Sequence, residues 1–188
     1  MKSTNLHIKN MVCPRCILVV TNELTEMGAE VTQAELGLVS VNLPDQLTND
    51  EIDAKLREFG FELLTDKEFQ VVEQIKIEAL KYLELLEKNE IAYNLSEYLI
   101  REIGKNYSYL SKLYSKHENT TIENYYISRK VKRVKELLSY NELTLSEIAI
   151  QLSYSSVHYL SSQFKRVTGQ SVSDYKKQLQ LILKTGVT

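Results

Sequence analysis

Two cysteines near the amino terminus, Cys13 and Cys16, are separated only by Pro14 and Arg15. Two thiolates at this spacing suit a soft ion such as Cu(I), or half of a tetrahedral zinc site that is completed from elsewhere. The same pair could instead report the thiol redox state of its surroundings. A third interpretation is a fold that carries the pair without any ligand. Cys13 and Cys16 are therefore the candidate metal or redox residues of this chain.

Further ligands for this pair would have to come from another part of the chain or from a second copy. His7 could supply one, although on an alternating strand it is expected to be an exposed polar residue. A homodimer could instead bring two pairs together in a four-thiolate site. The expected cofactor, if the pair binds metal, is Cu(I) or Zn(II), and a homodimer is one expected assembly.

The elements that position the cysteines alternate between strand and helix patterns. Period-2 alternation and three- to four-residue apolar spacing predict, in chain order, a strand at 6–11, a helix at 14–27, strands at 30–35 and 38–43, a helix at 50–59 and a strand at 61–64. This order is the split βαβ arrangement of ferredoxin-like domains, so the predicted fold class is α+β. The cysteines lie where the first helix begins, and its free N–H groups favour thiolates there.

This part of the chain resembles the heavy-metal-associated domains of copper chaperones and metal pumps. The similarity rests on the loop Met11-x-Cys13-Pro14-Arg15-Cys16 at the strand-to-helix junction, with Asn10 in place of the usual Gly. The resemblance implies that residues 1–65 form a sensor domain whose metal ligands are Cys13 and Cys16.

From Thr65 onward the pattern is helical. Thr65 with Glu68 predicts a capping box that opens a connecting helix over residues 66–90. Beyond it the sequence repeats at an offset of 50 residues: Leu95, Ser96, Glu97, Tyr109, Leu110, Ser111 and Tyr125 recur as Leu145, Ser146, Glu147, Tyr159, Leu160, Ser161 and Tyr175. Helix-start residues are matched as well, Asn94 with Thr144 and Asn106 with Ser156. The repeat predicts two helix-turn-helix units, at 94–117 and 144–168.

The second helix of each unit must bury one face and leave the other free for the major groove. The predicted packing residues are Leu110, Leu113 and Tyr114 in the first unit and Leu160, Phe164 and Val167 in the second. The outward residues are then Ser108, Ser111, Lys112 and Ser115, and His158, Ser161, Ser162 and Lys165. A helix at 122–140, with a run of Lys and Arg between its apolar positions, is predicted to join the two units.

Charge divides the chain in the same way. Residues 1–66 hold 5 basic and 11 acidic side chains, residues 67–103 hold 5 and 8, and residues 104–188 hold 13 and 6, which gives the last segment a net charge of +7. All 12 tyrosines lie at or after Tyr82. A basic, tyrosine-rich region behind an acidic one predicts two domains, the second facing an anionic partner.

Residues 94–177 resemble the DNA-binding domain of AraC-type transcription regulators. The similarity is carried by Leu145-Ser-Glu-Ile-Ala149, Tyr154-Ser-Ser156, Tyr159-Leu-Ser161, Phe164-Lys-Arg-Val-Thr-Gly169 and Tyr175-Lys-Lys177. It implies a DNA-binding domain over residues 91–180 whose base-reading positions are Tyr107, Ser108, Ser111, Lys112, Val157, His158, Ser161 and Ser162. The phosphate contacts are expected at Lys105, Lys116, Lys165 and Arg166. Since Ser162 stands where the family often has Arg, we expect Lys112 to carry more of the sequence specificity.

These features predict a transcription regulator that binds double-stranded DNA and responds to a soft metal or to thiol state. The alternative is a soft-metal carrier whose helical half binds protein partners. An enzyme is not expected, because the sequence has no nucleotide-binding glycine loop and its three histidines are scattered. No segment has 18 uninterrupted apolar residues and no secretory signal is recognisable, so we expect a cytoplasmic protein without a membrane span.

Overall fold

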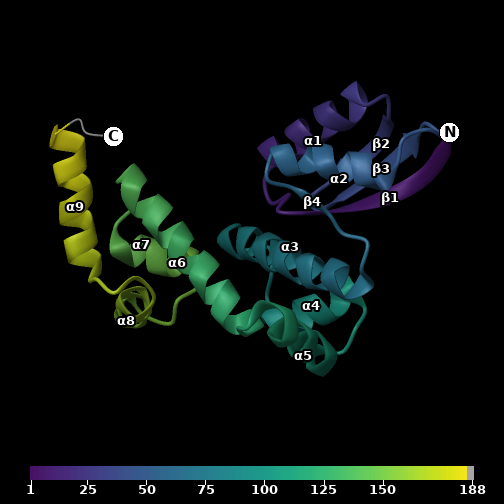
Figure 1. The fold of residues 1–188 in the computed structure, drawn as a ribbon. Coiled ribbons are helices and arrows are strands. Elements are labelled where there is room, and N and C mark those ends of the chain that lie inside the picture. Colours follow the sequence, from purple (N-terminus) through teal and green to yellow (C-terminus); the bar gives the residue numbers. More distant parts are fainter. Residues whose placement is uncertain (186–188) are drawn as a thin grey trace. The chain divides into compact units, whose positions relative to one another are not determined.

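The computed structural model of the chain describes residues 1–185, with side chains described through Leu181, and combines many helices with one small antiparallel sheet. Figure 1 shows the elements in chain order. Two compact units are present. The first comprises Met1–Glu78 and Leu99–Asn119, and the second comprises Ala79–Tyr98 and the chain from Thr120 onward. In the part of the chain that is described, no helix is long and apolar enough to cross a membrane.

The sheet is built from the amino-terminal elements of the first unit. These are β1 (Lys2–Lys9), α1 (Pro14–Glu26), β2 (Glu30–Glu35), β3 (Leu38–Leu43), α2 (Asn49–Glu58) and β4 (Glu62–Leu63). The strand order is β2-β3-β1-β4, and each neighbouring pair is antiparallel. Leu6 of β1 lies opposite Val39 of β3, and Ile8 lies opposite Leu63 of β4.

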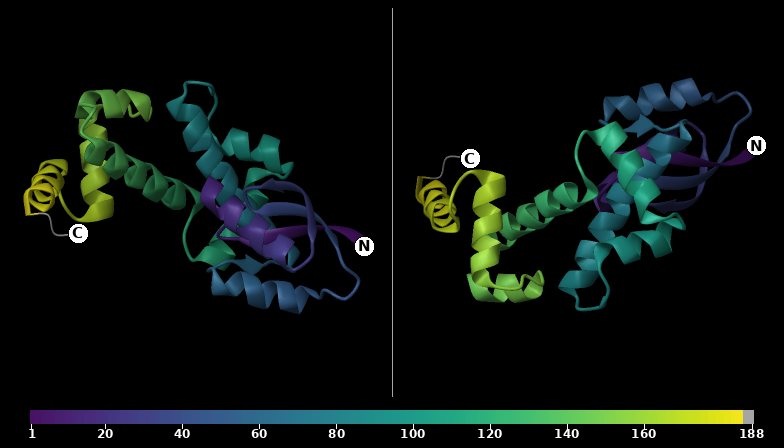
Figure 2. Two further views of the ribbon diagram at one scale, coloured as in Figure 1. Left: turned by 90° about the horizontal axis from the view of Figure 1, so that it is seen from above. Right: turned by 90° about the horizontal axis from the view of Figure 1, so that it is seen from below.

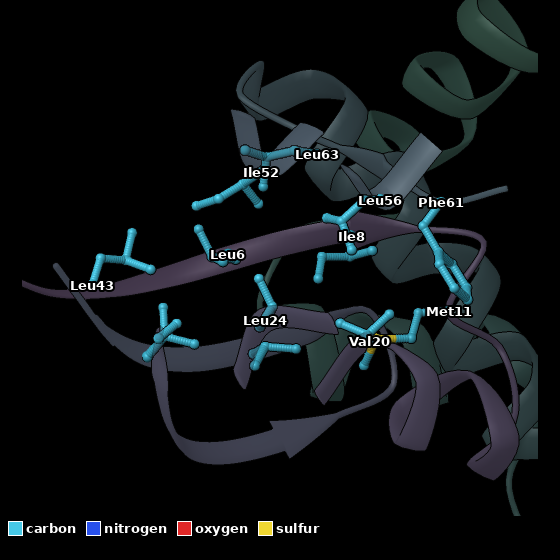
Figure 3. Packing of buried hydrophobic residues seen from close by; sticks show 13 residues of the cluster. Leu6, Ile8, Met11, Val20, Leu24, Leu43, Ile52, Leu56, Phe61 and Leu63 are labelled. Carbon is cyan, nitrogen blue, oxygen red and sulfur yellow. The ribbon is translucent and has the colours of Figure 1, made fainter. Parts of the chain in front are cut away.

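One face of this sheet carries the core of the first unit. Alternate residues of the central strands, such as Leu6 and Ile8, are buried against Val20 and Leu24 of α1. Ile52 and Leu56 of α2 join the same cluster, and Figure 3 shows these side chains converging on β1. Burial of a large aliphatic side chain contributes about 1.5–3 kcal/mol, so this cluster is the main source of stability for the sheet.

The first strand ends earlier in the chain than the sequence predicted. β1 stops at Lys9 because Asn10 adopts a left-handed backbone conformation, with φ of 68°. Asparagine tolerates this region better than most residues. Met11 is fully buried and belongs to the core cluster. The turn at Asn10 therefore leads the chain from β1 into the loop that carries Cys13.

The long helix α3 (Lys67–Glu87) begins with a different cap from the predicted one. The prediction of a Thr65–Glu68 capping box was wrong. Asp66 Oδ1 accepts the backbone N–H groups of Glu68 and Phe69, at 2.7 Å and 3.2 Å. Aspartate is an equally good cap, and its use leaves the Glu68 carboxylate free to bind Lys116 and His117, as described below.

The carboxyl-terminal elements are α4 (Leu95–Ile103), α5 (Tyr107–Glu118), α6 (Ile122–Tyr140), α7 (Leu145–Gln151), α8 (Val157–Thr168) and α9 (Val172–Thr185). The predicted cap residues Asn106 and Ser156 each accept the N–H of the third residue onward, Tyr109 and Tyr159. Thr144 forms the predicted full capping box. The helices after α4 therefore begin where the repeated residues indicated.

The second unit has its own core around α6. Val131, Val134 and Leu138 of α6 pack with Ile148 of α7 and Phe164 of α8, and Leu83 and Val172 belong to the same cluster. Figure 2 shows α7, α8 and α9 gathered around α6. The buried stripe of α6 thus supports the second helix-turn-helix pair, α7 and α8.

Candidate nucleic-acid interface and thiol loop

In the first helix-turn-helix unit, α5 has one buried face and one open face. Leu110, Leu113 and Tyr114 are buried, as predicted. On the opposite side, Ser108 and Lys112 are exposed, whereas Tyr107, Ser111 and Ser115 are half-buried. The predicted base-reading residues of this unit therefore share the accessible face of α5, where hydroxyl and ammonium groups can reach base edges.

In the second unit, α8 presents the corresponding face. His158, Ser162 and Lys165 are exposed, while Val157 and Ser161 are half-buried. Leu160 and Phe164 are buried as predicted.

The prediction that Val167 packs was wrong, because 42% of it is exposed in the last turn of α8. Gln163 takes a buried position instead, since its Oε1 accepts the Tyr154 hydroxyl at 2.9 Å. A buried amide is tolerated when it is hydrogen-bonded. The sequence repeat could have indicated this burial. Gln163 stands at the repeat position of Leu113, which is a predicted packing residue.

The four cations predicted to contact phosphate are all exposed. Lys105 precedes the start of α5, and Lys165 and Arg166 lie in the last turn of α8. Lys116 differs because its Nζ lies 2.6 Å from Glu68 Oε2, and this carboxylate raises the pKa of Lys116. Exposed pairs of this kind contribute little to stability.

The basic run on α6 does not form one open surface. Lys130 is only 9% exposed, its Nζ lies 4.0 Å from the centre of the Tyr154 ring, and burial lowers its pKa to about 8. Arg133 is held by Glu87, whose carboxylate accepts from Nε at 2.9 Å and from Nη2 at 2.9 Å. The basic run of α6 comprises Arg129, Lys130, Lys132, Arg133 and Lys135, and of these five only Lys132 is exposed. The sequence could not identify Glu87 as a partner, because it lies 46 residues from Arg133.

The thiol loop joins β1 to α1. Cys13 is the N-cap of α1, and its Sγ lies 2.9 Å from Sγ of Cys16, one helical turn away. The hydrogen bond from Cys16 lowers the pKa of the Cys13 thiol, whereas burial is the main cause that raises the pKa of Cys16. Cys13 is therefore the more readily ionised thiol, and both are free cysteines.

These two thiols are the donors that the loop itself provides. Within residues 1–185, no group of three or more His, Cys, Asp and Glu side chains is arranged to hold a metal ion. His7 is half-buried on β1, and burial lowers its pKa. Two sulfur donors fit a soft ion in two-fold coordination, whereas tetrahedral zinc would need two further ligands.

Comparison with known proteins identifies the carboxyl-terminal part of the chain. Residues 99–178 match the profile of a family described as a helix-turn-helix domain. This part of the chain is therefore similar to helix-turn-helix domains. The match runs from within α4 to within α9 and leaves the sheet outside.

Two curated relatives share this region. The chain is 30% identical over 82 residues to the Msm operon regulatory protein of Streptococcus mutans, which is 44% of this chain and 30% of that protein. It is also 30% identical over 84 residues to the uncharacterised HTH-type transcriptional regulator YdiP of Escherichia coli, 45% of this chain and 28% of that one. The chain thus spans less than a third of the length of these relatives.

Solved structures give weaker similarities. The C-terminal domain of AraT, a response regulator from Geobacillus stearothermophilus, aligns with a TM-score of 0.49 and 21% identity over 57% of this chain and 84% of that one. A DNA-binding transcriptional dual regulator from Escherichia coli aligns with a TM-score of 0.48 and 16% identity, over 57% of this chain and 93% of that one.

Proposed function

We propose that the chain is a sequence-specific, DNA-binding transcription regulator, and we assign it no catalytic role. The observation that carries this proposal is the duplicated helix-turn-helix arrangement, in which α5 and α8 each expose short hydroxyl and basic side chains. The match of residues 99–178 to the helix-turn-helix family supports it. So does the net charge of +7 over residues 104–188.

In this proposal α5 is the first recognition helix and α8 is the second, and the two read successive openings of the major groove. The base-reading residues are Tyr107, Ser108, Ser111, Lys112, Val157, His158, Ser161 and Ser162, and the phosphate contacts are Lys105, Lys116, Lys165 and Arg166. The connecting helix α6 has 19 residues, about 28 Å at 1.5 Å per residue. Successive openings on one face of DNA are about 34 Å apart, so a connector of this length suits adjacent sites on one duplex.

We further propose that the amino-terminal sheet is a ferredoxin-like sensor domain similar to heavy-metal-associated domains. The element order and the antiparallel strand order β2-β3-β1-β4 support this assignment. Cys13 and Cys16 would hold Cu(I) as a two-thiolate ligand pair, or Zn(II) if a second copy supplied two more thiolates. In the redox version, the two thiols lose two electrons and two protons to a disulfide such as oxidised glutathione, which becomes two thiols.

The DNA-binding proposal is tested by selecting bound sequences from a random duplex pool, with and without Cu(I). We expect one enriched motif and an affinity that falls steeply with salt, because each phosphate contact releases counterions. Absence of an enriched motif, together with an affinity that does not vary with salt, would refute DNA recognition.

The sensor proposal is tested by equilibrium dialysis against Cu(I), Zn(II) and Cd(II). The wild type is compared with the variant Cys13→Ser/Cys16→Ser, and we expect thiol-dependent uptake of one ion per chain or per dimer. If no ion is taken up in a thiol-dependent way and oxidation of the thiols leaves operator affinity unchanged, the sensor proposal fails.

A soft-metal carrier is the second candidate function. The exposed apolar side chains Val12 and Leu18, which flank the thiol pair, favour it, since a docking surface beside the metal loop would serve transfer to a partner. Salt dependence separates the two candidates, because a carrier should bind DNA negligibly at any ionic strength.

A further inference from the structure

The first half of α3 lies between the thiol loop and α5, and all three belong to the first compact unit. On the side of the loop, the backbone N–H of Asn10 donates to Glu73 Oε1 at 2.9 Å. Asn10 is the residue at which β1 turns into the thiol loop, and its side chain donates to the carbonyl oxygen of Gly60 at 3.0 Å. Ile77, one turn further along α3, packs against Gly37, where an added Cβ would meet the Cδ1 atom of Ile77.

On the side of α5, the Glu73 carboxylate is the first of a row of charged side chains that continues with Lys76 and Glu118. Glu73 is 4% exposed, and its Oε2 lies 3.4 Å from Nζ of Lys76. The same Nζ lies 2.8 Å from Oε1 of Glu118, the last residue of α5. Asn10, Glu73, Lys76 and Glu118 therefore form a continuous chain of polar contacts from the thiol loop to the end of the first recognition helix.

A second set of contacts holds the same turn of α5. Glu68 Oε2 lies 2.6 Å from Nζ of Lys116 and 2.8 Å from Nε2 of His117. The ring of Phe69 meets the His117 ring edge-on, with centroids 4.5 Å apart. This set is more exposed than the row through Glu73, and it joins α5 to α3 without a contact to the loop.

A buried carboxylate is costly when it loses a partner, because the remaining charge is then uncompensated. If the Asn10 N–H group is displaced, the Glu73 carboxylate must therefore move with it or accept a hydrogen bond from another donor. Any movement of Glu73 acts on Lys76, and through Lys76 on Glu118. Only Met11 and Val12 separate Asn10 from Cys13, so a change in the backbone conformation at Cys13 reaches Asn10 over a short stretch of chain.

We propose that the thiol loop acts on the first recognition helix through Glu73 and Lys76. In this proposal, binding of Cys13 and Cys16 to one shared atom changes the conformation of the last turn of α5. The inference rests on the proposed function only in taking the thiols as the responsive site. The second recognition helix α8 packs on α6, α7 and α9, and it serves as the internal reference.

The coupling can be tested without knowing the natural ligand. Phenylarsine oxide bridges two neighbouring thiols through one arsenic atom and releases one water. Amide hydrogen exchange of the full chain is measured with and without this probe. We expect exchange in residues 107–119 to change by about fivefold, the lower end of ordinary coupling, and exchange in residues 157–168 to stay the same. Cys13→Ser/Cys16→Ser should show no effect of the probe.

Variants of the relay decide whether the path is the proposed one. Lys76→Met and the milder Glu118→Gln should abolish the response in residues 107–119. Lys76→Arg keeps a cation between the two carboxylates, so residues 107–119 of this variant should respond as in the wild type. Lys67→Met, an exposed lysine on the same helix, is the matched control and should respond like the wild type. Melting temperatures of all variants are recorded, and Glu118→Gln provides the decision if Lys76→Met does not fold.

Three results would overturn the inference. The first is an unchanged exchange rate in residues 107–119 of the wild type, and the second is an equal change in residues 157–168. The third is a response in Glu118→Gln that equals the wild-type response. These outcomes are separate from the fate of the proposed function, because the exchange measurement requires neither DNA binding nor uptake of a metal. A chain that binds no DNA would refute the regulator while the exchange result still decides the coupling.

Discussion

The two helix-turn-helix units share a scaffold but differ in what holds their recognition helices. Both α5 and α8 have 12 residues and a side-chain N-cap at the same repeat position. The middle of α5 is held by the buried residues Leu110, Leu113 and Tyr114, and its last turn also contacts α3 through Lys116, His117 and Glu118. α8 is held by apolar packing and by one buried hydrogen bond, from Tyr154 to Gln163.

The difference lies in the last turn of α5, which makes charged contacts with α3 in addition to the buried apolar residues of the helix. Ion pairs respond to charge and salt, whereas a packed core resists small changes. The last turn of α5 should therefore respond to charge and salt more than the packed contacts of α8 do. Four predictions test this contrast, in order of decreasing expected effect.

The largest effect is expected when the buried polar residue of the second unit is copied into the first. Leu113→Gln places an amide at a site that is 5% exposed, and the loss of packing and of hydrogen bonds to water should cost about 3 kcal/mol of unfolding free energy. The reverse change, Gln163→Leu, leaves the Tyr154 hydroxyl without its partner and should cost about 1 kcal/mol. Urea unfolding of both variants measures the difference, and equal losses would contradict the contrast.

The second prediction concerns the buried Lys130. Its pKa falls from an ordinary 10.5 to about 8, so the folded state releases its proton at lower pH than the unfolded state. Stability should therefore rise with pH in this window, by about 2 kcal/mol between pH 8 and pH 10. Lys130→Met removes the titrating group and should show no such rise relative to wild type. Chemical unfolding at several pH values provides the measurement, and parallel curves for the two proteins would refute it.

The third prediction compares the two recognition faces. Lys112→Ala removes an exposed ammonium from α5, and DNA affinity should fall about tenfold with a loss of base preference. Ser162→Ala, at the matched position of α8, should change affinity by about twofold or less. Electrophoretic binding at one fixed salt concentration measures both. A larger effect at Ser162 would assign sequence specificity to the second unit instead.

The smallest effect concerns the turns. Ser153 precedes Tyr154 with φ of 49°, whereas the first turn uses Gly104 with φ of 68°. A left-handed backbone costs a residue with a side chain about 1 kcal/mol more than glycine. Ser153→Gly should therefore stabilise the chain by about 1 kcal/mol, and Gly104→Ser should destabilise it by a similar amount. Thermal melting of the two variants checks the pair, and a destabilised Ser153→Gly would contradict it.

Local signals predicted local structure well. Cap residues and apolar spacing placed α6 at Ile122–Tyr140, the predicted range, and identified the starts of α5 and α8. The capping error at Thr65 arose because its neighbour Asp66 is as good a cap, and sequence alone does not choose between adjacent candidates.

Contacts between distant residues were outside the reach of sequence reasoning. Arg133 and Glu87 lie 46 residues apart, and Asn10 and Glu73 lie 63 apart. A single sequence contains no periodic signal for such pairs. The exposure of Val167 is a related case, since helical spacing places it on the packing stripe but only the fold determines whether a neighbour is there to cover it.

The position of Cys13 also determines which variants are neutral controls. Cys13 occupies the N-cap of α1 with extended backbone angles, but its side chain makes no capping hydrogen bond. A hydroxyl oxygen at an N-cap accepts such a bond and adds roughly 1 kcal/mol to helix stability. Replacing Cys13 by serine is therefore expected to raise the thermal stability of the chain in addition to removing the sulfur. An alanine replacement, which cannot cap, separates these two effects in every comparison of melting temperatures.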